Sequence, residues 1–373
     1  MNLRSHTTVN SRREAIEKEL SVELKNIGQC SIDESVASSR NCENMIGTAQ
    51  IPMGIAGPLL LNNKEYYIPL ATTEGALVAS INRGCKAVTT SEGAWVDSYK
   101  IGATRGPVFK VQSLSQSKEL FNFVNKHEKE LRGVASGTSS HLNLTKTIMT
   151  GVGKYMYLRF SFDTQDAMGM NMVTIAADQL SKYIAERTGI PLLAVAGNID
   201  ADKKPAWSHA IQHRGIEAWA ECTLSADVLT NILKTTAKNV YEVWLAKCMI
   251  GSALSGSIGF NAQMANVLSA MFIATGQDPA HVVEASVGMT TAEVINGDNL
   301  YISVFMPDLM VGTVGGGTGL GTQKEALSIL GVKTSRELAE IIAGAVLAGE
   351  ISLLASLSVG TLAQSHQKLA RGK

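Results

Sequence analysis

The chain has 373 residues, and Lys+Arg and Asp+Glu each number 33, so its formal net charge is zero. A chain of this length suggests two or three domains with a large core. Its neutrality argues against nucleic acid or an anionic membrane surface as the main partner. Charged residues make up 18% and hydrophobic residues 45%, which excludes general disorder and predicts that some surface is buried between subunits.

The N-terminal residues favour a short amphipathic helix. Ser11 and Glu14 have the spacing of a capping box, and apolar residues recur at every fourth position over Ile16–Leu24, before Gly28. No apolar signal-peptide core precedes them. Five widely spaced cysteines without a CxxC pair are typical of a reducing compartment. We therefore expect a soluble, cytoplasmic protein.

The next two segments differ in their predicted secondary structure. Apolar runs broken by Gly and Pro over 46–70 predict strands and turns, and a helix is expected over 76–88. Residues 107–196 then mix strands (VFKVQ, KYMYLRFSF, LLAVAG) with a charged helix (SKELFNFVNKHEKEL) and a helix over 171–187. This spacing predicts a compact α+β unit, separate from the rest of the chain.

The final third is expected to be mainly helical, because small residues are frequent in it. Thr334 and Glu337 form a predicted capping box ahead of a long apolar segment that begins at Ile341. Glu350 interrupts this segment, and neither flank reaches the roughly 18 apolar residues of a membrane span. A buried core helix is the better interpretation.

Two charged motifs could support chemistry. Glu74, in ATTEGALVAS, opens an otherwise apolar helix, where desolvation raises a carboxyl pKa towards that of a general acid. The alternative is an acidic residue that complements the helix macrodipole. Lys203 and Lys204, in DKKP, could hold an anionic substrate and stabilise an oxyanion. The alternative is a solvated surface turn.

Two glycine-rich loops and one histidine complete the candidates. DAMGMNM and TVGGGTGLG each precede a helix, where backbone N–H groups suit phosphate, but neither matches the dinucleotide fingerprint. Tight packing turns explain them equally well. His366, near the C-terminus, could swing in as a general acid or could do nothing. No metal site is expected, because the remaining histidines show no ligand spacing: His6, His127, His209, His213 and His281.

Taken together, the motifs resemble the 3-hydroxy-3-methylglutaryl-coenzyme A (HMG-CoA) reductase family, in its soluble eukaryotic and archaeal form. The matching pieces are ENMIG, IPMGIAGPL, ATTEGALVAS, NRGCKA, TRGPV, DAMGMNM, DKKPA, GSALSGSIGFNA, GQD, TVGGGTGLG and the final SH. They stand in the family's order over about residues 43–366. This resemblance implies the reduction of HMG-CoA to mevalonate and free coenzyme A by two hydride transfers from NADPH, with NADH as the alternative.

The resemblance also implies catalytic roles. Lys203 would stabilise the negative charge on the thioester oxygen, and Glu74 would protonate the aldehyde oxygen. Asp278, in GQD, would link Glu74 and Lys203 in one network. His366 would protonate the departing coenzyme A thiolate. Cys85 is better explained by packing than as a nucleophile.

Binding residues follow by the same comparison. Residues expected around the HMG carboxylate or Lys203 are Arg105, Asp202, Lys204 and Asn266. Residues in the coenzyme A stretches are Glu43, Ser80, Asn82, Arg83 and Lys247. Residues in the cofactor stretches are Asp166, Met168, Gly169, Asn171, Gly315 and Thr318, and Ser139, Ser140 and His141 stand where the family reads the cofactor 2′-phosphate.

The implied fold class is α+β. A large, mainly helical substrate domain (43–106 and 196–373) would carry an inserted, ferredoxin-like NADP-binding domain (107–195), after a short helical N-terminal segment (1–42). The implied partners are HMG-CoA, mevalonate and coenzyme A. A homodimer with an active site between subunits is expected, with a tetramer as the alternative and no membrane or nucleic acid.

Four departures from the family pattern bear on function. Ala196 replaces a serine that helps to hold HMG, and Gln263 replaces a histidine after the FNA sequence. Ser139-Ser140 replaces Ser-Arg, which grips phosphate more firmly, and Gly372 stands where a regulatory serine is usual. Two alternatives therefore stay open: a coenzyme-A-ester binder without activity, and a NAD-dependent enzyme that oxidises mevalonate.

Overall fold

The computed structural model describes residues 48–360 without a gap, together with residues 6, 9–25, 32–33, 36–37 and 40–41. Within the first part, helix α1 (Val9–Leu20) forms over the predicted stretch. It begins before Ser11, so the expected capping box there is wrong. Ile16 and Leu24 are buried against Tyr67, which confirms the apolar face.

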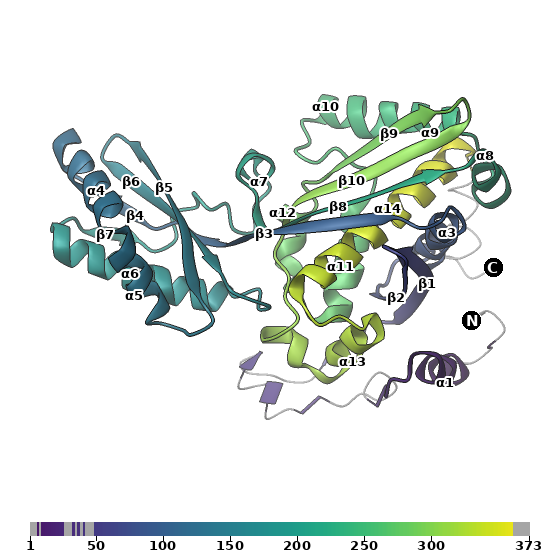
Figure 1. Cartoon of the computed structure of the whole chain (residues 1–373), viewed down its shortest axis with the longest axis horizontal. Coiled ribbons are helices and arrows are strands. Elements are labelled where there is room, and N and C mark those ends of the chain that lie inside the picture. The colour runs from purple at the N-terminus through teal and green to yellow at the C-terminus, as the bar shows by residue number, and fades with distance from the viewer. Residues whose placement is uncertain are drawn as a thin grey trace.

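An eight-stranded sheet runs through the molecule and joins its two lobes (Figure 1). The strand order is β7-β4-β6-β3-β8-β10-β9, and β5 pairs with β6. The strands are β3 (Trp95–Arg105), β4 (Val108–Lys110), β5 (Asn143–Val152), β6 (Tyr155–Asp163), β7 (Leu192–Ala194), β8 (Arg214–Leu224), β9 (Met289–Ile295) and β10 (Asn299–Leu309). One end of β3 pairs with β8 and the other with β6, so this strand passes from one lobe to the other.

The smaller lobe contains β4–β7 and three helices. These are α4 (Leu114–Lys126), α5 (Glu128–Ser136) and α6 (Met170–Thr188). The elements follow one another as β-α-β-β-α-β, with α4 and α5 together forming the first crossover, and their strands pair antiparallel in the order β7-β4-β6-β5. Their apolar faces enclose a core of their own around Phe109, Phe160 and Leu180. The predicted α+β unit is therefore present, with the charged helix divided at His127.

The larger lobe is organised around α14 (Ser335–Ser358). Its N-cap, Thr334, forms the predicted capping box with Glu337. The helix packs on α3 (Leu77–Thr90), on α11 (Met264–Thr275) and on β8 and β10. Although α14 is long and apolar enough to cross a membrane, 83% of its most apolar window is buried inside the structure. This confirms the prediction of a core helix.

The remaining elements surround α14. A two-stranded sheet of β1 (Met53–Leu61) and β2 (Lys64–Ala71) packs on α3 and α11. The other helices are α7 (Trp207–Gln212), α8 (Ala226–Val228), α9 (Ala237–Trp244), α10 (Ser252–Ser255), α12 (Val282–Ala285) and α13 (Gly321–Leu330), with π-helical η2 (Leu229–Leu233) and η3 (Leu245–Gly251) and 3₁₀ turns η4 (Pro279–His281) and η5 (Gly316–Gly319).

The final third is mainly helical, as expected, but it also contains strands that the sequence analysis did not predict. The strands β8, β9 and β10 all lie in it. In β8, Cys222 and Leu224 point inward while Glu221 and Thr223 are exposed, which is the alternation of a half-buried strand. The sequence carried this period-two signal, but small inward residues such as Ala218 and Ala220 weakened it.

Gly84 tests how closely α3 approaches α14. A Cβ atom at this position would lie 1.9 Å from the carbonyl oxygen of Ala348. We expect Gly84→Ala to lower the free energy of unfolding by about 1–3 kcal/mol, because the two backbones must separate. The matched control is Gly133→Ala in α5, where a Cβ meets nothing within 4 Å. It should be neutral or slightly stabilising. Denaturant unfolding measures both, and equal stability of the two variants would contradict this packing.

Candidate active site

Lys203 and Asp278 form an ion pair at the centre of the candidate site. Lys203 lies in the loop between β7 and α7, with φ of 56°, a strained conformation for a residue with a side chain. Its Nζ lies 2.6 Å from Oδ2 of Asp278, and the two side chains are 41% and 33% exposed. Oδ1 of Asp278 accepts the backbone N–H of Ala280, which fixes the carboxylate at the start of η4. The predicted pair is therefore present and faces solvent.

Asp278 is held in its charged form. Burial raises the pKa of this carboxyl group, but the hydrogen bond from Lys203, that from Ala280 and the nearby charges outweigh burial, so the pKa is lowered overall. A charged Asp278 keeps the ammonium group of Lys203 in place.

Buried charges lie directly beneath this pair. Asp202 accepts a hydrogen bond from Nη2 of Arg214 (2.7 Å) and pairs with Nη1 of Arg105 (3.3 Å). Arg214 also donates to Oε1 of Glu284 (2.9 Å), and Glu284 accepts the backbone N–H of Lys203 (3.3 Å). The side chains of Arg214 and Glu284 are completely buried. This network fixes the backbone on which Lys203 stands.

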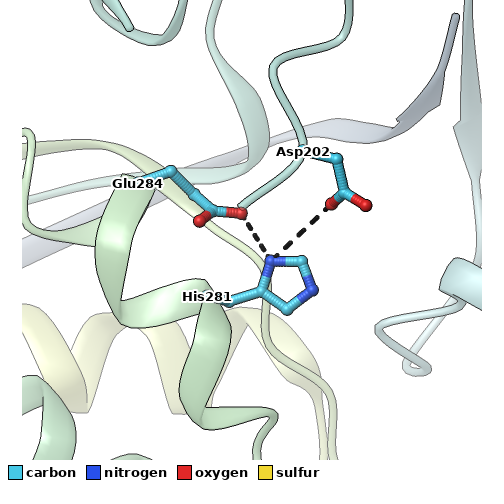
Figure 2. A group of neighbouring side chains, drawn as sticks. All are labelled: Asp202, His281 and Glu284. Carbon is cyan, nitrogen blue, oxygen red and sulfur yellow. Dashed lines mark hydrogen bonds and ion pairs between the residues drawn. The ribbon is translucent and has the colours of Figure 1, made fainter. Parts of the chain in front are cut away.

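Asp202, His281 and Glu284 could by composition hold a metal ion, because one ligand atom of each lies within 4.8 Å of the others. Figure 2 shows the ring of His281 between the two carboxyl groups, with its Nδ1 2.5 Å from Oε1 of Glu284. However, the guanidinium of Arg214 already binds both carboxylates. A metal ion would be placed against that cation, so the arrangement favours an ion-pair network. The absence of a metal stays a prediction.

Glu74 lies apart from this pair. It is exposed in the turn that precedes α3, so it does not open the helix as expected, and its Oε1 is 3.5 Å from Nδ2 of Asn266. Among the described residues, no hydrogen bond or ion pair joins Glu74 to Lys203 or Asp278. The predicted network of these three side chains is thus only half assembled within one chain.

A cavity of about 710 Å³ opens beside Glu74. Four further predicted binding residues line it: Ser80, Asn82, Arg83 and Asn266. Arg83 donates to Ser352 and Ser356 of α14, and Asn82 accepts the backbone N–H of Gly57. Lys86, in NRGCKA, also lines the cavity and is exposed. The sequence reasoning missed this lysine, although a cation beside a predicted coenzyme A stretch was a usable signal.

Lys247 lines a second cavity, of about 560 Å³, together with Pro205. Pro205 follows the two predicted catalytic-loop lysines, and Lys204 is exposed next to it. Cys85 is fully buried, and burial raises the pKa of its thiol to about 12, which confirms a packing role. Glu43 and His366 lie outside the described residues.

The predicted cofactor stretches lie next to one another. The backbone N–H of Thr313 donates to the carbonyl of Asp166 (2.8 Å), and Ala167 forms a parallel bridge with Val314. His141 Nδ1 lies 3.0 Å from Oε1 of Gln165. The two glycine-rich loops and the turn at 139–141 therefore meet at the N-terminus of α6.

The side chains in these stretches differ in whether they are already hydrogen-bonded within the protein or exposed to solvent. The Asp166 carboxylate binds the first residue of α14, Ser335, and Thr318 is buried with its hydroxyl bonded to the Gly315 carbonyl. Asn171, in contrast, is exposed on the first turn of α6. A Cβ atom at Gly315 would meet nothing within 4 Å, so space is open beside that loop.

Comparisons with known proteins agree with this geometry. The family model described as hydroxymethylglutaryl-coenzyme A reductase matches residues 8–371. The 3-hydroxy-3-methylglutaryl-coenzyme A reductase of Methanothermobacter thermautotrophicus is 46% identical over 98% of this chain and 94% of its own length. That of Methanocaldococcus jannaschii is 46% identical over 96% of this chain and 92% of its own length. The chain therefore belongs to the HMG-CoA reductase family.

The solved structures show the same fold. A class II HMG-CoA reductase from Streptococcus pneumoniae, described as bound to NADPH in open conformations, superimposes with a TM-score of 0.78. The match covers 95% of this chain and 98% of the other, at 19% sequence identity. The mixed helix and strand architecture is thus that of known members.

Glu350 provides a test of how the large cavity is built. This carboxylate, wholly buried on α14, accepts the backbone N–H groups of Ala262 and Gln263 and the hydroxyl of Thr290, at 2.6–2.7 Å. We expect Glu350→Gln to cost about 1–3 kcal/mol, because its amide N–H would face a backbone N–H. Denaturant unfolding measures the loss, and Glu242→Gln on exposed α9 is the control.

The pH dependence of stability provides a second readout of the same variant. Burial raises the pKa of Glu350, against its three hydrogen bonds. The native state therefore binds this proton more tightly than the unfolded chain, and stability falls as pH rises above the ordinary value of 4.5. This contribution should be missing in Glu350→Gln. An unchanged unfolding midpoint and pH slope would contradict the role assigned to Glu350.

Proposed function

We propose that the protein reduces HMG-CoA to mevalonate and free coenzyme A in isoprenoid biosynthesis, with two NADPH and two protons consumed per turnover. The Lys203–Asp278 pair, placed at 2.6 Å on a solvent-accessible surface, is the observation that carries this proposal. Family membership supports it. A protein that only bound the thioester would not need a lysine held in place by a carboxylate.

The residues of this chain stabilise negative charge on the substrate and donate protons to it. NADPH, when bound, supplies the hydride for each of the two reductions. Lys203 lies where an ammonium group can stabilise negative charge on the thioester oxygen and later on the aldehyde oxygen. Glu74 donates a proton to the aldehyde oxygen. His366 protonates the departing thiolate, which has an ordinary thiol pKa near ~8.5, so that it does not attack the aldehyde again.

Substrate and cofactor occupy different parts of the molecule in this proposal. Coenzyme A enters the cavity beside Glu74, where Arg83 and Lys86 supply positive charge for its phosphates. Lys247, in the second cavity, and Glu43 are assigned to coenzyme A from the family resemblance alone. The HMG carboxylate lies near Arg105, Asp202, Lys204 and Asn266. Ala196 lacks the serine hydroxyl with which the family helps to hold HMG, so a neighbouring residue supplies that contact. The Gln263 amide is already bonded to the Gly349 carbonyl (2.7 Å).

The adjoining glycine-rich loops fit a dinucleotide. Met168, Gly169 and Asn171 lie at the N-terminus of α6, where backbone N–H groups favour phosphate. Ser139, Ser140 and His141 face the 2′-phosphate of NADPH, and their weaker grip keeps NADH as the alternative. We accordingly assign 107–195 as a ferredoxin-like cofactor domain inserted between 43–106 and 196–373, after the segment 1–42. Its separate core and its β-α-β-β-α-β order support this division.

A homodimer with shared active sites is the proposed active unit, with a tetramer as the larger alternative. Within one chain, Glu74 faces the first cavity and has no contact with the Lys203–Asp278 pair. A second copy can bring its own Glu74 to that pair, which would complete the catalytic set at a two-fold interface. We also propose a cytoplasmic location, because Cys85, Cys222 and Cys248 are free, buried thiols.

A spectrophotometric assay with purified protein, HMG-CoA and NADPH or NADH in parallel tests the reaction. We expect two cofactors oxidised per mevalonate formed. Lys203→Met should lower kcat at least about 100-fold, because the oxyanion loses its charge partner, while the circular dichroism spectrum and Tm stay unchanged. The control Lys238→Met, on exposed α9, should keep the full rate.

Three outcomes would separate the alternatives. A near-normal rate of Lys203→Met would refute the catalytic assignment. HMG-CoA binding without cofactor oxidation would indicate a binder. Faster turnover of mevalonate with NAD and coenzyme A than of HMG-CoA with either reduced cofactor would favour the oxidative enzyme.

The shared active site predicts complementation between two inactive variants. Glu74→Gln and Lys203→Met are each expected to be inactive alone. When they are co-refolded in equal amounts, half of the dimers are mixed, and each mixed dimer holds one intact site. Activity should return to about a quarter of the wild-type value. No recovery, with mixed dimers demonstrated by differential tags, would place all catalytic groups in one chain.

A further inference from the structure

His209 lies directly behind the loop between β7 and α7 that carries Lys203. It stands on the short helix α7, which follows DKKP, and its side chain is only 1% exposed. Its Nε2 is 2.8 Å from the backbone carbonyl oxygen of Lys204. Its Nδ1 is 2.6 Å from Oδ2 of Asp308 on β10. The imidazole thus bridges the loop and the central sheet.

These two contacts determine the protonation state of the ring. A carbonyl oxygen only accepts, so Nε2 must carry a proton. Apart from the ion pair with His209, neither carboxylate oxygen of fully buried Asp308 has a hydrogen-bond partner in the part of the chain that the structure describes. A carboxylate buried in this way needs a cation next to it. The ion-pair contact of 2.6 Å therefore favours a second proton on Nδ1, which would make His209 an imidazolium.

The surrounding charges are consistent with that state. Burial lowers the pKa of His209, but the hydrogen bond and charge of Asp308 and the Lys204 carbonyl outweigh burial, so the pKa is raised overall. Arg214 on β8 opposes the charge of the ring, but Asp202 and Glu284 bind Arg214. The other charged groups in this region are Arg159 on β6 and Asp200 in the loop.

The loop needs external support. Asn198, Ala201 and Lys203 all have φ between 51° and 60°, a region that side chains disfavour. Such a backbone persists only where neighbouring groups hold it. At the far end of α7, Arg159 donates to the carbonyl of His213 (2.8 Å). His209 provides the corresponding tie at the near end.

We propose that His209 is a positioning residue: as an imidazolium it ties the Lys204 carbonyl to Asp308 and so holds the strained segment 198–204 with Lys203 directed at Asp278. This inference rests on the proposed reduction, in which Lys203 acts on the substrate oxygen. His209 itself touches no substrate. Its effect on the reaction passes entirely through the backbone of the loop.

The two contacts of the His209 ring, to the Lys204 carbonyl and to Asp308, form what we call the His209 clamp. This clamp predicts a specific pH dependence. The ring has a raised pKa in the native state, so its contribution to stability is complete below the ordinary value of about 6.5 and is lost as pH rises through the raised value. Above that pKa the ring keeps one proton but still faces two acceptors, the Lys204 carbonyl and Asp308. One of these two contacts is then lost. Lys203 then loses its fixed position, and kcat falls while substrate binding in the cavity beside Glu74 changes less.

Two variants test this inference against a control. His209→Gln keeps an N–H donor for Lys204 but has no charge. We expect kcat at pH 7 to fall about tenfold with KM for HMG-CoA changed less than threefold, and the alkaline limb of the pH profile to lose one ionisation. Asp308→Asn removes the stabilising carboxylate, so the limb should move to lower pH. His127→Asn, whose ring bonds the Phe123 carbonyl in the other lobe, should match the wild type.

Nitrogen NMR of the histidine-labelled protein measures the protonation of each ring nitrogen directly. The His209 signals are assigned by their loss in His209→Gln. At pH 6.5, the ordinary pKa of the imidazole, the doubly protonated ring should predominate. One unprotonated nitrogen would overturn the proposal. So would variants that lose Tm but keep the wild-type kcat and pH profile, since that result describes a purely structural residue. If the wild type oxidises no cofactor, the proposed function fails, whereas the ring titration still decides whether the clamp exists.

Discussion

The buried guanidinium of Arg214 is the interaction on which the candidate site depends. It contacts four segments that are far apart in the chain: Thr104 at the end of β3, the Met170 sulfur at the start of α6, Asp202 in the catalytic loop and Glu284 in α12. An unpaired buried charge is very costly, so each partner is required by the others. Removal of one partner of such a network typically costs 3–5 kcal/mol. The loop with Lys203, the helix α12 and the start of α6 are therefore fixed by one charge.

The other half of the site depends on α14 instead. Ser352 and Ser356 bind Arg83 on one side of the cavity, and Glu350 binds the backbone at 262–263 on the other. These polar groups stand within a helix that is otherwise apolar and buried, and all are hydrogen-bonded, as buried polar groups must be. Glu74 and Asn266 project from the walls that this helix supports. The two halves are thus built by different networks, which explains why one chain can fold with Glu74 separate from the Lys203–Asp278 pair.

Local patterns in the sequence were sufficient for much of the fold. The apolar run of β6 and the capping box of α14 were predicted because both signals lie within a few residues. The strand β8 was missed, because alanines on its inner face gave a weak alternation. Ionic partners could not be predicted: nothing in the sequence near Arg214 or His209 points to Glu284 or Asp308. Such pairs exist only after distant strands and turns have been brought together. Lys203 was proposed as catalytic through resemblance, whereas its positive φ and its supporting charges required the structure.

The side chain of Gln277 links the Lys203–Asp278 region to the glycine-rich loop predicted to hold the cofactor. Its Oε1 accepts the backbone N–H of Gly312 (2.9 Å) and its Nε2 donates to the carbonyl of the same residue (3.0 Å). Asp278 follows it directly, and the glycine-rich loop begins one residue after Gly312. The amide is buried, so neither hydrogen bond competes with water. In the proposed reaction, a hydride donor on this loop and the ammonium group of Lys203 must both reach one carbonyl group, within tolerances well under an ångström. The side-chain amide of Gln277, which ties Gly312 to the residue beside Asp278, helps to set their separation.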